Sequence, residues 1–185
     1  MLAGKEIVLG VTGGIAAYKA CEIIRGLRKE GANVIVILTA SGSRFITPLT
    51  LQTLSNNPVH TDMFNLISES DIGHISLSQR ADLMLIAPAT ANIIGKVRNG
   101  IADDFLSTAA MATTAPILMA PAMNSEMYAK AAVQENIEAL KQRGVVFVAP
   151  GVGELACGAV GQGRLADTDE ILEMVRIMLS DKIQA

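Results

Sequence analysis

Asn124 has the sequence setting of a binding residue. It follows a run of apolar residues at 117–120, and Ser125 and Glu126 are of the types that begin a helix. Pro121 stiffens the turn between the run and this helix. Asn124 could therefore be held rigidly, with its amide donor and acceptor facing a crevice. It could equally do no more than cap the helix, so this segment alone leaves both interpretations open.

Two other side chains have the chemistry of proton transfer. His74 precedes the third predicted strand and is the best candidate for a proton carrier near neutral pH, although a lone histidine is more often structural. Cys157 lies in the glycine-rich segment 150–164, where a thiol with no structural use would be a liability, so we interpret it as catalytic. By contrast, we expect His60 in an exposed loop and Cys21 in a helix core.

The loops after the first two predicted strands have features of a phosphate site. Gly13 and Gly14 allow close approach of the backbone and precede a helix whose amide groups favour an anion. They do not form the Gly-x-Gly-x-x-Gly motif, and no acidic residue follows the second strand to bind a ribose, so a dinucleotide is disfavoured. Thr39, Ser41 and Ser43 offer hydroxyls for a single phosphate. A mononucleotide such as FMN fits this pattern.

The elements that must position these residues alternate between strands and helices. We predict strands at 5–11, 33–38, 83–87, 116–120 and 145–149. An early helix with apolar positions Ala17, Cys21, Ile24 and Leu27 ends at Gly31, and a last helix spans about 169–179. This pattern predicts an α/β fold with a doubly wound, mostly parallel, Rossmann-like sheet between two helical layers. Because ligands bind beyond the carboxyl ends of such strands, the loops that follow the strands are expected to form one groove.

Composition restricts the class of protein. The 185 residues are half hydrophobic, 18% charged and 3% aromatic, with a net charge of -3, which disfavours nucleic-acid binding. We expect one domain over 1–185, with 180–185 as a polar tail or the start of a linker. No apolar run is long enough for a membrane span, and no Cys/His cluster indicates a metal. The two distant cysteines favour a reducing, cytoplasmic location.

Four spaced motifs together resemble the homo-oligomeric, flavin-containing cysteine decarboxylases over essentially the whole chain. They are Gly-Gly-Ile-Ala-Ala-Tyr-Lys at 13–19, Pro-Ala-Thr-Ala-Asn-Ile at 88–93, Pro-Ala-Met-Asn-Ser-Glu-Met-Tyr at 121–128, and Ala-Cys-Gly-x-x-Gly-x-Gly-Arg at 156–164. The second departs from the family's Pro-Ala-Ser-Ala-Asn-Thr at Thr90, which keeps the hydroxyl, and at Ile93, which removes one. Tyr128 stands where many members have tryptophan.

The resemblance implies FMN as cofactor and assigns roles to individual residues. His74 would assist an oxidative step, Asn124 would hold the substrate carboxylate with Met127 beside it, and Cys157 would be the final proton donor. The flavin contacts implied by the motifs and the hydroxyl loop are Gly13, Gly14, Ile15, Thr39, Ser41, Thr90, Ala91, Asn92 and Ala122. Within the family, the motifs are most similar to the members that decarboxylate 4′-phosphopantothenoylcysteine to 4′-phosphopantetheine in coenzyme A biosynthesis, through thioaldehyde and ene-thiol intermediates.

The same resemblance implies partners and leaves alternatives. Members of the family form trimers, or dodecamers built from trimers, and a phosphopantothenate–cysteine ligase domain can follow in the natural protein. A flavin decarboxylase of peptidyl cysteine is the second candidate, although the segment 156–164 is of the small-molecule type. A prenylated-flavin synthase would be expected to lack the motif at 121–128. A non-catalytic regulatory subunit would commonly carry acidic or disordered extensions, which are not seen here.

Overall fold

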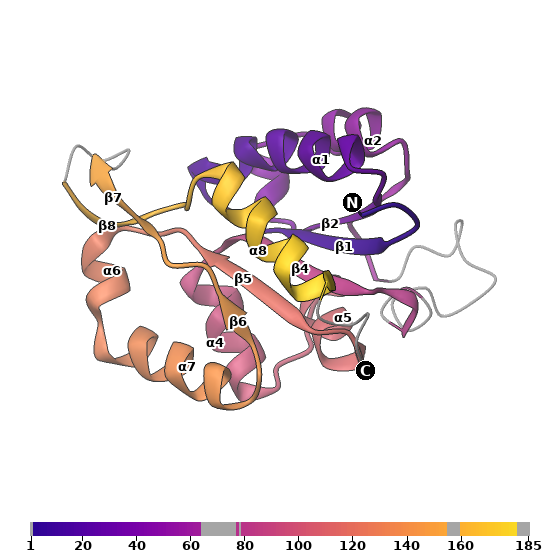
Figure 1. The fold of residues 1–185 in the computed structure, drawn as a ribbon. Coiled ribbons are helices and arrows are strands. Elements are labelled where there is room, and N and C mark those ends of the chain that lie inside the picture. The colour runs from indigo at the N-terminus through magenta and orange to yellow at the C-terminus, as the bar shows by residue number, and fades with distance from the viewer. Residues whose placement is uncertain (1, 64–76, 78, 155–159, 181–185) are drawn as a thin grey trace.

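A six-stranded sheet forms the centre of the computed structural model, which describes residues 2–63, 77, 79–154 and 160–180 (Figure 1). Its strands are all parallel and lie in the order β3-β2-β1-β4-β5-β6. They are β1 (Glu6–Val11), β2 (Asn33–Leu38), β3 (Val59–His60), β4 (Leu83–Ala89), β5 (Ile117–Pro121) and β6 (Val146–Phe147). The predicted α/β fold with a doubly wound parallel sheet is confirmed. The strand order reverses between β1 and β4, which makes this pair the topological switch point.

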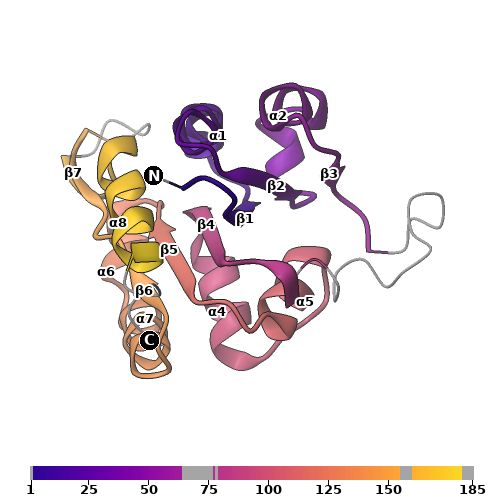
Figure 2. The same cartoon turned by 45° about the vertical axis from the view of Figure 1, so that its right-hand side comes forward.

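Helices cover both faces of the sheet and bury its side chains. One core contains Leu9 and Leu85 and packs against α1 (Ala20–Lys29), α2 (Pro48–Ser55) and α8 (Thr168–Ser180). The other contains Val8 and Met84 and packs against α4 (Ala91–Asn99), α5 (Phe105–Ala112) and α7 (Ala131–Gln142). Figure 2 shows α1 and α2 on one side of the sheet, with α4 and α5 on the other. Every residue of β4 is buried, so neither face of this strand carries polar side chains, and its sequence is a continuous apolar run.

Local sequence determines where α4 ends and where α5 begins, and this part of the chain forms one wall of the site. Gly100, at φ +70°, ends α4 in a left-handed conformation that glycine adopts without strain. Asp104 then caps α5 by accepting a hydrogen bond of 2.8 Å from the backbone N–H of Ser107, and the Ser107 hydroxyl accepts from the Asp104 N–H at 3.1 Å. This reciprocal capping box fixes the start of α5 four residues after the end of α4 at Gly100.

All five predicted strands match observed ones to within two residues at each end, and the main differences are at the edges of the sheet. The last predicted strand, 145–149, contracts to Val146–Phe147. His60, expected in an exposed loop, lies instead in the edge strand β3, half-buried, with its ring centroid 5.1 Å from that of Phe105. Cys21 lies beside the buried stripe of α1 instead of within it, and its partial burial raises the pKa of its thiol.

The glycine-rich segment contains a second, two-stranded sheet that sequence reasoning treated as a loop. Strand β7 (Gly151–Glu154) pairs antiparallel with β8 (Val160–Arg164), and the ribbon extends beside α6 (Ser125–Ala129) in Figure 1. Cys157 lies between these strands in the chain and His74 precedes β4, and both fall outside the described residues. No helix in the described part of the chain is long and apolar enough to cross a membrane.

Candidate functional site

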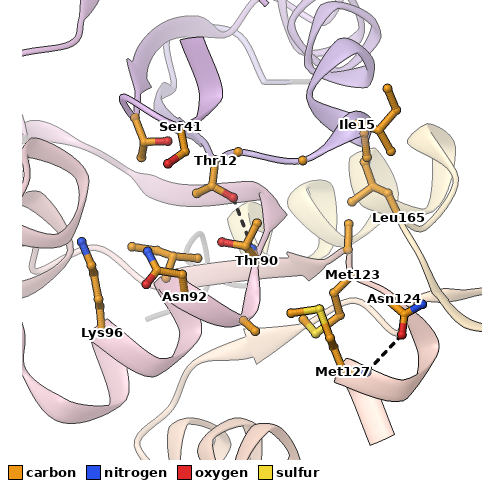
Figure 3. A pocket seen from close by; sticks show the side chains of 18 of the residues that line it. Thr12, Ile15, Ser41, Thr90, Asn92, Lys96, Met123, Asn124, Met127 and Leu165 are labelled. Carbon is orange, nitrogen blue, oxygen red and sulfur yellow. Dashed lines mark hydrogen bonds between the residues drawn. The ribbon is translucent and has the colours of Figure 1, made fainter. Parts of the chain in front are cut away.

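A cavity of about 1050 Å³ opens at the carboxyl ends of the strands, beside the switch point between β1 and β4. Its walls are the loops that follow β1, β2, β4 and β5, together with the end of β8 and the first part of α4. Figure 3 shows side chains from these elements converging on it. The loops after the five predicted strands were expected to form one groove. The loops after β1, β2, β4 and β5 do line the cavity, and the segment after β6 lines it through the end of β8.

Thr12 joins the two strands of the switch point. Its side chain is buried, and Oγ1 donates a hydrogen bond to the Pro88 carbonyl at 2.6 Å and accepts one from the Thr90 N–H at 3.2 Å (Figure 3). Both partners are backbone groups where β4 passes into α4, beyond the last residue pair of β1 with β4, Gly10 with Ile86. One hydroxyl thus joins the loop that follows β1 to the loop that follows β4.

The two glycines after β1 have different roles. A Cβ at Gly13 would clash with the Cβ of Ser41, so glycine is required there for the β1 loop to pack against the β2 loop. Gly14 has φ -164°, an extended conformation open to any residue, and a Cβ there would meet only Thr90 Cγ2 at 4.0 Å. Gly14 therefore leaves space in the cavity without being required by the backbone. A 3-10 helix, η1 (Ile15–Lys19), follows.

The predicted hydroxyl cluster is divided between the loop and the cavity. Thr39 Oγ1 donates to the Val11 carbonyl at 3.3 Å and accepts from the Gly42 N–H at 3.1 Å, so it mainly stabilises its own turn. The Ser43 hydroxyl donates to the Ala40 carbonyl at 2.8 Å, and Ser43 does not line the cavity. Ser41 does line it (Figure 3).

The amino end of α4 faces the cavity. Thr90 is the N-cap residue, but its side chain makes no capping hydrogen bond, while Ala91 and Asn92 in the first turn line the wall. The first backbone N–H groups of a helix lack partners within the helix, and the helix dipole makes this end positive. The end of α4 is therefore suited to an electron-rich group of a ligand.

Asn124 caps a helix and also lies at the cavity. Its Oδ1 accepts hydrogen bonds from the backbone N–H groups of Glu126 at 2.8 Å and Met127 at 3.4 Å, which caps α6. The residue also lines the cavity, next to the half-exposed Met127 (Figure 3). The loop itself is held to β4 by a hydrogen bond of 3.1 Å from the Ala122 N–H to the Ala89 carbonyl.

The β7–β8 ribbon packs on the Asn124 loop through glycines. The Met123 N–H donates to the Gly163 carbonyl at 2.9 Å, and a Cβ at Gly163 would clash with the Met123 carbonyl oxygen. Gly163 also has φ +151°, which L side chains rarely adopt. A Cβ at Gly161 would lie 2.8 Å from Ser125 Cβ. The ribbon and the Asn124 loop are thus built as one wall of the cavity.

Charged residues that sequence reasoning missed line two parts of the cavity. Lys96 Nζ lies 2.6 Å from Asp103 Oδ1 and 2.7 Å from Asp104 Oδ2. Burial acts to lower the pKa of Lys96, but the hydrogen bonds to both aspartates raise it above its usual value. Burial acts to raise the pKa of the Asp104 carboxyl, but hydrogen bonds from Lys96 and Ser107 hold it below its usual value. Asn92 and Lys96 are four residues apart and therefore lie on the same face of α4. Because Asn92 was expected at the cavity, this spacing could have indicated that Lys96 lies there too.

A second charged group lies near Asn124. Arg164 Nη2 is 3.1 Å from Asp167 Oδ1, and Lys19 Nζ is 3.9 Å from the same oxygen. Lys19 and Arg164 line the cavity. Each is the last residue of a sequence motif, but their proximity depends on how the ribbon folds back, which no local pattern shows.

Of the predicted cofactor and substrate residues that the structure describes, all except Ser43 line the cavity. These are Gly13, Gly14, Ile15, Thr39, Ser41, Thr90, Ala91, Asn92, Ala122, Asn124 and Met127. Thr12, Tyr18, Lys19, Lys96, Asp103, Asp104, Met123, Arg164 and Leu165 also line it and were not predicted. Among the described residues there is no group of three or more His, Cys, Asp or Glu side chains placed to bind a metal.

Comparison with protein families and curated proteins gives consistent matches. A family model described as Flavoprotein matches residues 1–180. The chain is 48% identical over 185 residues to the coenzyme A biosynthesis bifunctional protein CoaBC of Bacillus subtilis, covering 100% of this chain and 46% of the relative. It is 49% identical over 173 residues to CoaBC of Escherichia coli K12, covering 94% of this chain and 43% of the relative. The chain thus spans less than half the length of these curated relatives.

Solved structures with the same fold include three informative ones. A variant of PPC decarboxylase in complex with pantothenoylaminoethenethiol has a TM-score of 0.84 at 28% identity, over 95% of this chain and 98% of that one. The FMN-dependent cysteine decarboxylase SpaF also has a TM-score of 0.84 at 28% identity, over 97% and 99% of the two chains. The FMN-binding protein AtHal3 has a TM-score of 0.82 at 30% identity, over 98% of each.

Proposed function

Because the chain belongs to the flavoprotein family, we propose that it binds FMN in the cavity and catalyses decarboxylation of 4′-phosphopantothenoylcysteine to 4′-phosphopantetheine. The observation that carries this proposal is the meeting of three distant motifs, at 13–19, 88–93 and 121–128, around one cavity. The similarity to CoaBC proteins and to a PPC decarboxylase supports the substrate, and the FMN-dependent and FMN-binding neighbours support the cofactor.

The residues present fit FMN. The volume of about 1050 Å³ is at the upper end of the roughly 300–1,000 Å³ of ligand pockets, so it has room for a mononucleotide and a substrate together. The space at Gly14 admits a ligand close to the backbone, and the uncapped end of α4 offers N–H groups to an electron-rich ring edge. Ser41 offers a hydroxyl for the phosphate. When bound, FMN would accept two electrons from the substrate and return them after carbon dioxide leaves.

The protein's own residues bind, orient and protonate the substrate in this proposal. Asn124 holds the carboxylate through its amide while its Oδ1 keeps α6 capped, so the side chain is fixed before the substrate arrives. Met127 packs beside the carboxylate and excludes water from it. His74 assists the oxidative step, and Cys157 donates the final proton; both assignments rest on the family resemblance.

Assembly and context form a further part of the proposal. Ile15, Tyr18, Phe45 and Leu49 are large apolar residues that are 50–72% exposed near the cavity loops, and they support a homotrimer or a dodecamer of trimers. The bifunctional relatives support a ligase domain that follows this one in the natural, cytoplasmic protein. Light scattering of the purified chain, which should give a multiple of three protomers, checks the assembly.

One experiment tests the function directly. The purified chain is loaded with FMN, the cofactor is released and identified by mass, and carbon dioxide release is assayed with phosphopantothenoylcysteine. Bound FMN and release of carbon dioxide with formation of phosphopantetheine are expected. Bound FAD, or no turnover by a flavin-loaded protein, would contradict the proposal.

The second candidate is a decarboxylase of peptidyl cysteine, which the likeness to SpaF favours. The same assay with a short peptide ending in cysteine separates the two. Faster carbon dioxide release from the peptide than from phosphopantothenoylcysteine would select this alternative.

A further inference from the structure

The charges around the cavity are unevenly distributed. On the α4–α5 wall, Lys96 is matched by Asp103 and Asp104, which leaves a formal charge of about -1 at neutral pH. On the ribbon side, Lys19 and Arg164 share the single carboxylate of Asp167, which leaves a charge of about +1. Figure 3 shows Lys96 at one side of the cavity and Leu165, the neighbour of Arg164, at the other side with Asn124. An anionic ligand group is therefore drawn to the ribbon side.

The basic pair has the geometry of an anion site. Both cationic nitrogens lie against the same oxygen of Asp167, which shows that the two side chains can converge on one acceptor. Lys19 is partly buried, with 18% of its side chain exposed, whereas Arg164 and Asp167 are 46% and 63% exposed. A partly buried lysine supplies a point charge, and an arginine that can still turn presents a planar fork suited to phosphate oxygens.

We propose that Lys19 and Arg164 bind the phosphate monoester of the substrate, with the Asp167 carboxylate as a weaker acceptor that competes for the same two cations. The inference rests on the proposed decarboxylase function and adds its specificity determinant. A phosphate monoester carries about -1.5 to -2 charges at neutral pH, more than one carboxylate can offer the pair. The Asn124 amide then holds the carboxylate end of the same molecule, so the substrate is bound at both ends. A substrate without phosphate lacks the second anchor.

The pair also has a purely structural interpretation, in which it only ties η1 and β8 to the start of α8. The two interpretations predict opposite effects of Asp167→Asn on the binding of the phosphorylated substrate. Asp167→Asn removes the competing charge, so it should lower the KM for the phosphorylated substrate if the pair is an anion site. If the pair is a structural link, the same change should weaken binding of every ligand.

The test compares phosphopantothenoylcysteine with its dephosphorylated form, in the FMN-loaded protein. Lys19→Gln and Arg164→Gln should each raise the KM for the phosphorylated substrate about tenfold, as expected for one charge-assisted hydrogen bond in a partly exposed site. The KM for the dephosphorylated substrate and the Kd for FMN should not change. Arg25→Gln, at an exposed position of α1 outside the cavity lining, is the charge-matched control. Asp167→Asn should lower the KM for the phosphorylated substrate severalfold.

Each contrary result overturns a distinct claim. A weakened FMN affinity in Lys19→Gln and Arg164→Gln, with an unchanged ratio of the two KM values, would assign the pair to the cofactor phosphate. Equal losses for both substrates, or a raised KM in Asp167→Asn, would make the pair a structural link. Failure of the unmodified protein to decarboxylate either substrate would overturn the proposed function, and this inference with it. Calorimetric binding of phosphopantetheine and pantetheine gives the same comparison without turnover.

Discussion

Replacing Thr12 by valine should destabilise the fold and the cavity together. Valine has nearly the shape of threonine, so packing is preserved, but the hydroxyl that joins β1 to β4 is lost. The Pro88 carbonyl, now 2.6 Å from its donor, and the Thr90 N–H, 3.2 Å from its acceptor, would both lose that partner. Thr12 is only 3% exposed, so water cannot readily replace the hydroxyl.

The expected magnitude follows from these two groups. A buried polar group left without a partner costs about 1–3 kcal/mol, so two of them cost about 2–6 kcal/mol. Burial of the added methyl group returns no more than about 1 kcal/mol. We therefore expect the free energy of unfolding to fall by about 3 kcal/mol in Thr12→Val. Thr12→Ser keeps the hydroxyl and loses one methyl group, which should cost only about 1 kcal/mol.

Urea unfolding of the two variants without cofactor, followed by circular dichroism, measures the difference. With a slope of about 2 kcal/mol per molar urea, Thr12→Val should unfold at a urea concentration roughly 1.5 M lower than the unmodified chain. Equal midpoints for Thr12→Val and Thr12→Ser would refute the reasoning, because they would show that the hydroxyl bridge contributes nothing beyond packing.

Four further outcomes are expected. Gly14→Leu should fold normally, since φ there is -164°, but should lose FMN affinity at least tenfold in a fluorescence titration because its side chain enters the cavity; unchanged affinity would place the cofactor elsewhere. Asn124→Asp should keep the α6 cap and FMN binding, because a carboxylate oxygen accepts the same hydrogen bonds, yet lose nearly all carbon dioxide release; normal turnover would reduce Asn124 to a cap. Gly163→Ala should lower the free energy of unfolding by about 1–3 kcal/mol through strain at φ +151°, measured by urea unfolding against Gly153→Ala, where nothing lies within 4 Å of an added Cβ. The pKa of Asp104 is held low, so its charge stabilises the fold above the ordinary carboxylate pKa and this contribution is lost as pH falls through the lower folded value; Asp104→Asn should therefore flatten the acid side of a stability–pH profile, and an unaltered profile would contradict this.

The strands and their loops were predictable because each signal is local. The runs at 34–38 and 83–87 are apolar throughout, so burial on both faces could be inferred from composition alone. The residues that follow β1, β4 and β5 were assigned to one groove because parallel strands bring their carboxyl ends to the same edge. Asn124 and the last four residues of the 88–93 motif therefore line the cavity as expected.

The rest depends on contacts between distant segments. Strand β3 has two residues, too few for a periodic pattern, and its contacts are with distant segments: it pairs with β2, and His60 packs on Phe105. The β7–β8 ribbon was taken for a loop because glycine disfavours strands, yet glycine is what lets this ribbon approach the Asn124 loop. Lys96 lies in α4, whereas Asp103 and Asp104 lie just before α5. These charges meet because the chain turns at Gly100 between the two helices.

The position of β1 at the switch point also has a consequence for the order of assembly. Strand β1 pairs with β2 across a short helical connection, whereas its pairing with β4 joins Ile7 to Leu83 across most of the first half of the chain. Closing a longer loop costs more chain entropy, so we expect the β1–β2 unit to form before β4 docks on it. Thr12 gains its partners on β4 only at that docking step. The loop after β1 is thus present early in folding, but a nucleotide has nothing to bind until the two halves of the sheet have met.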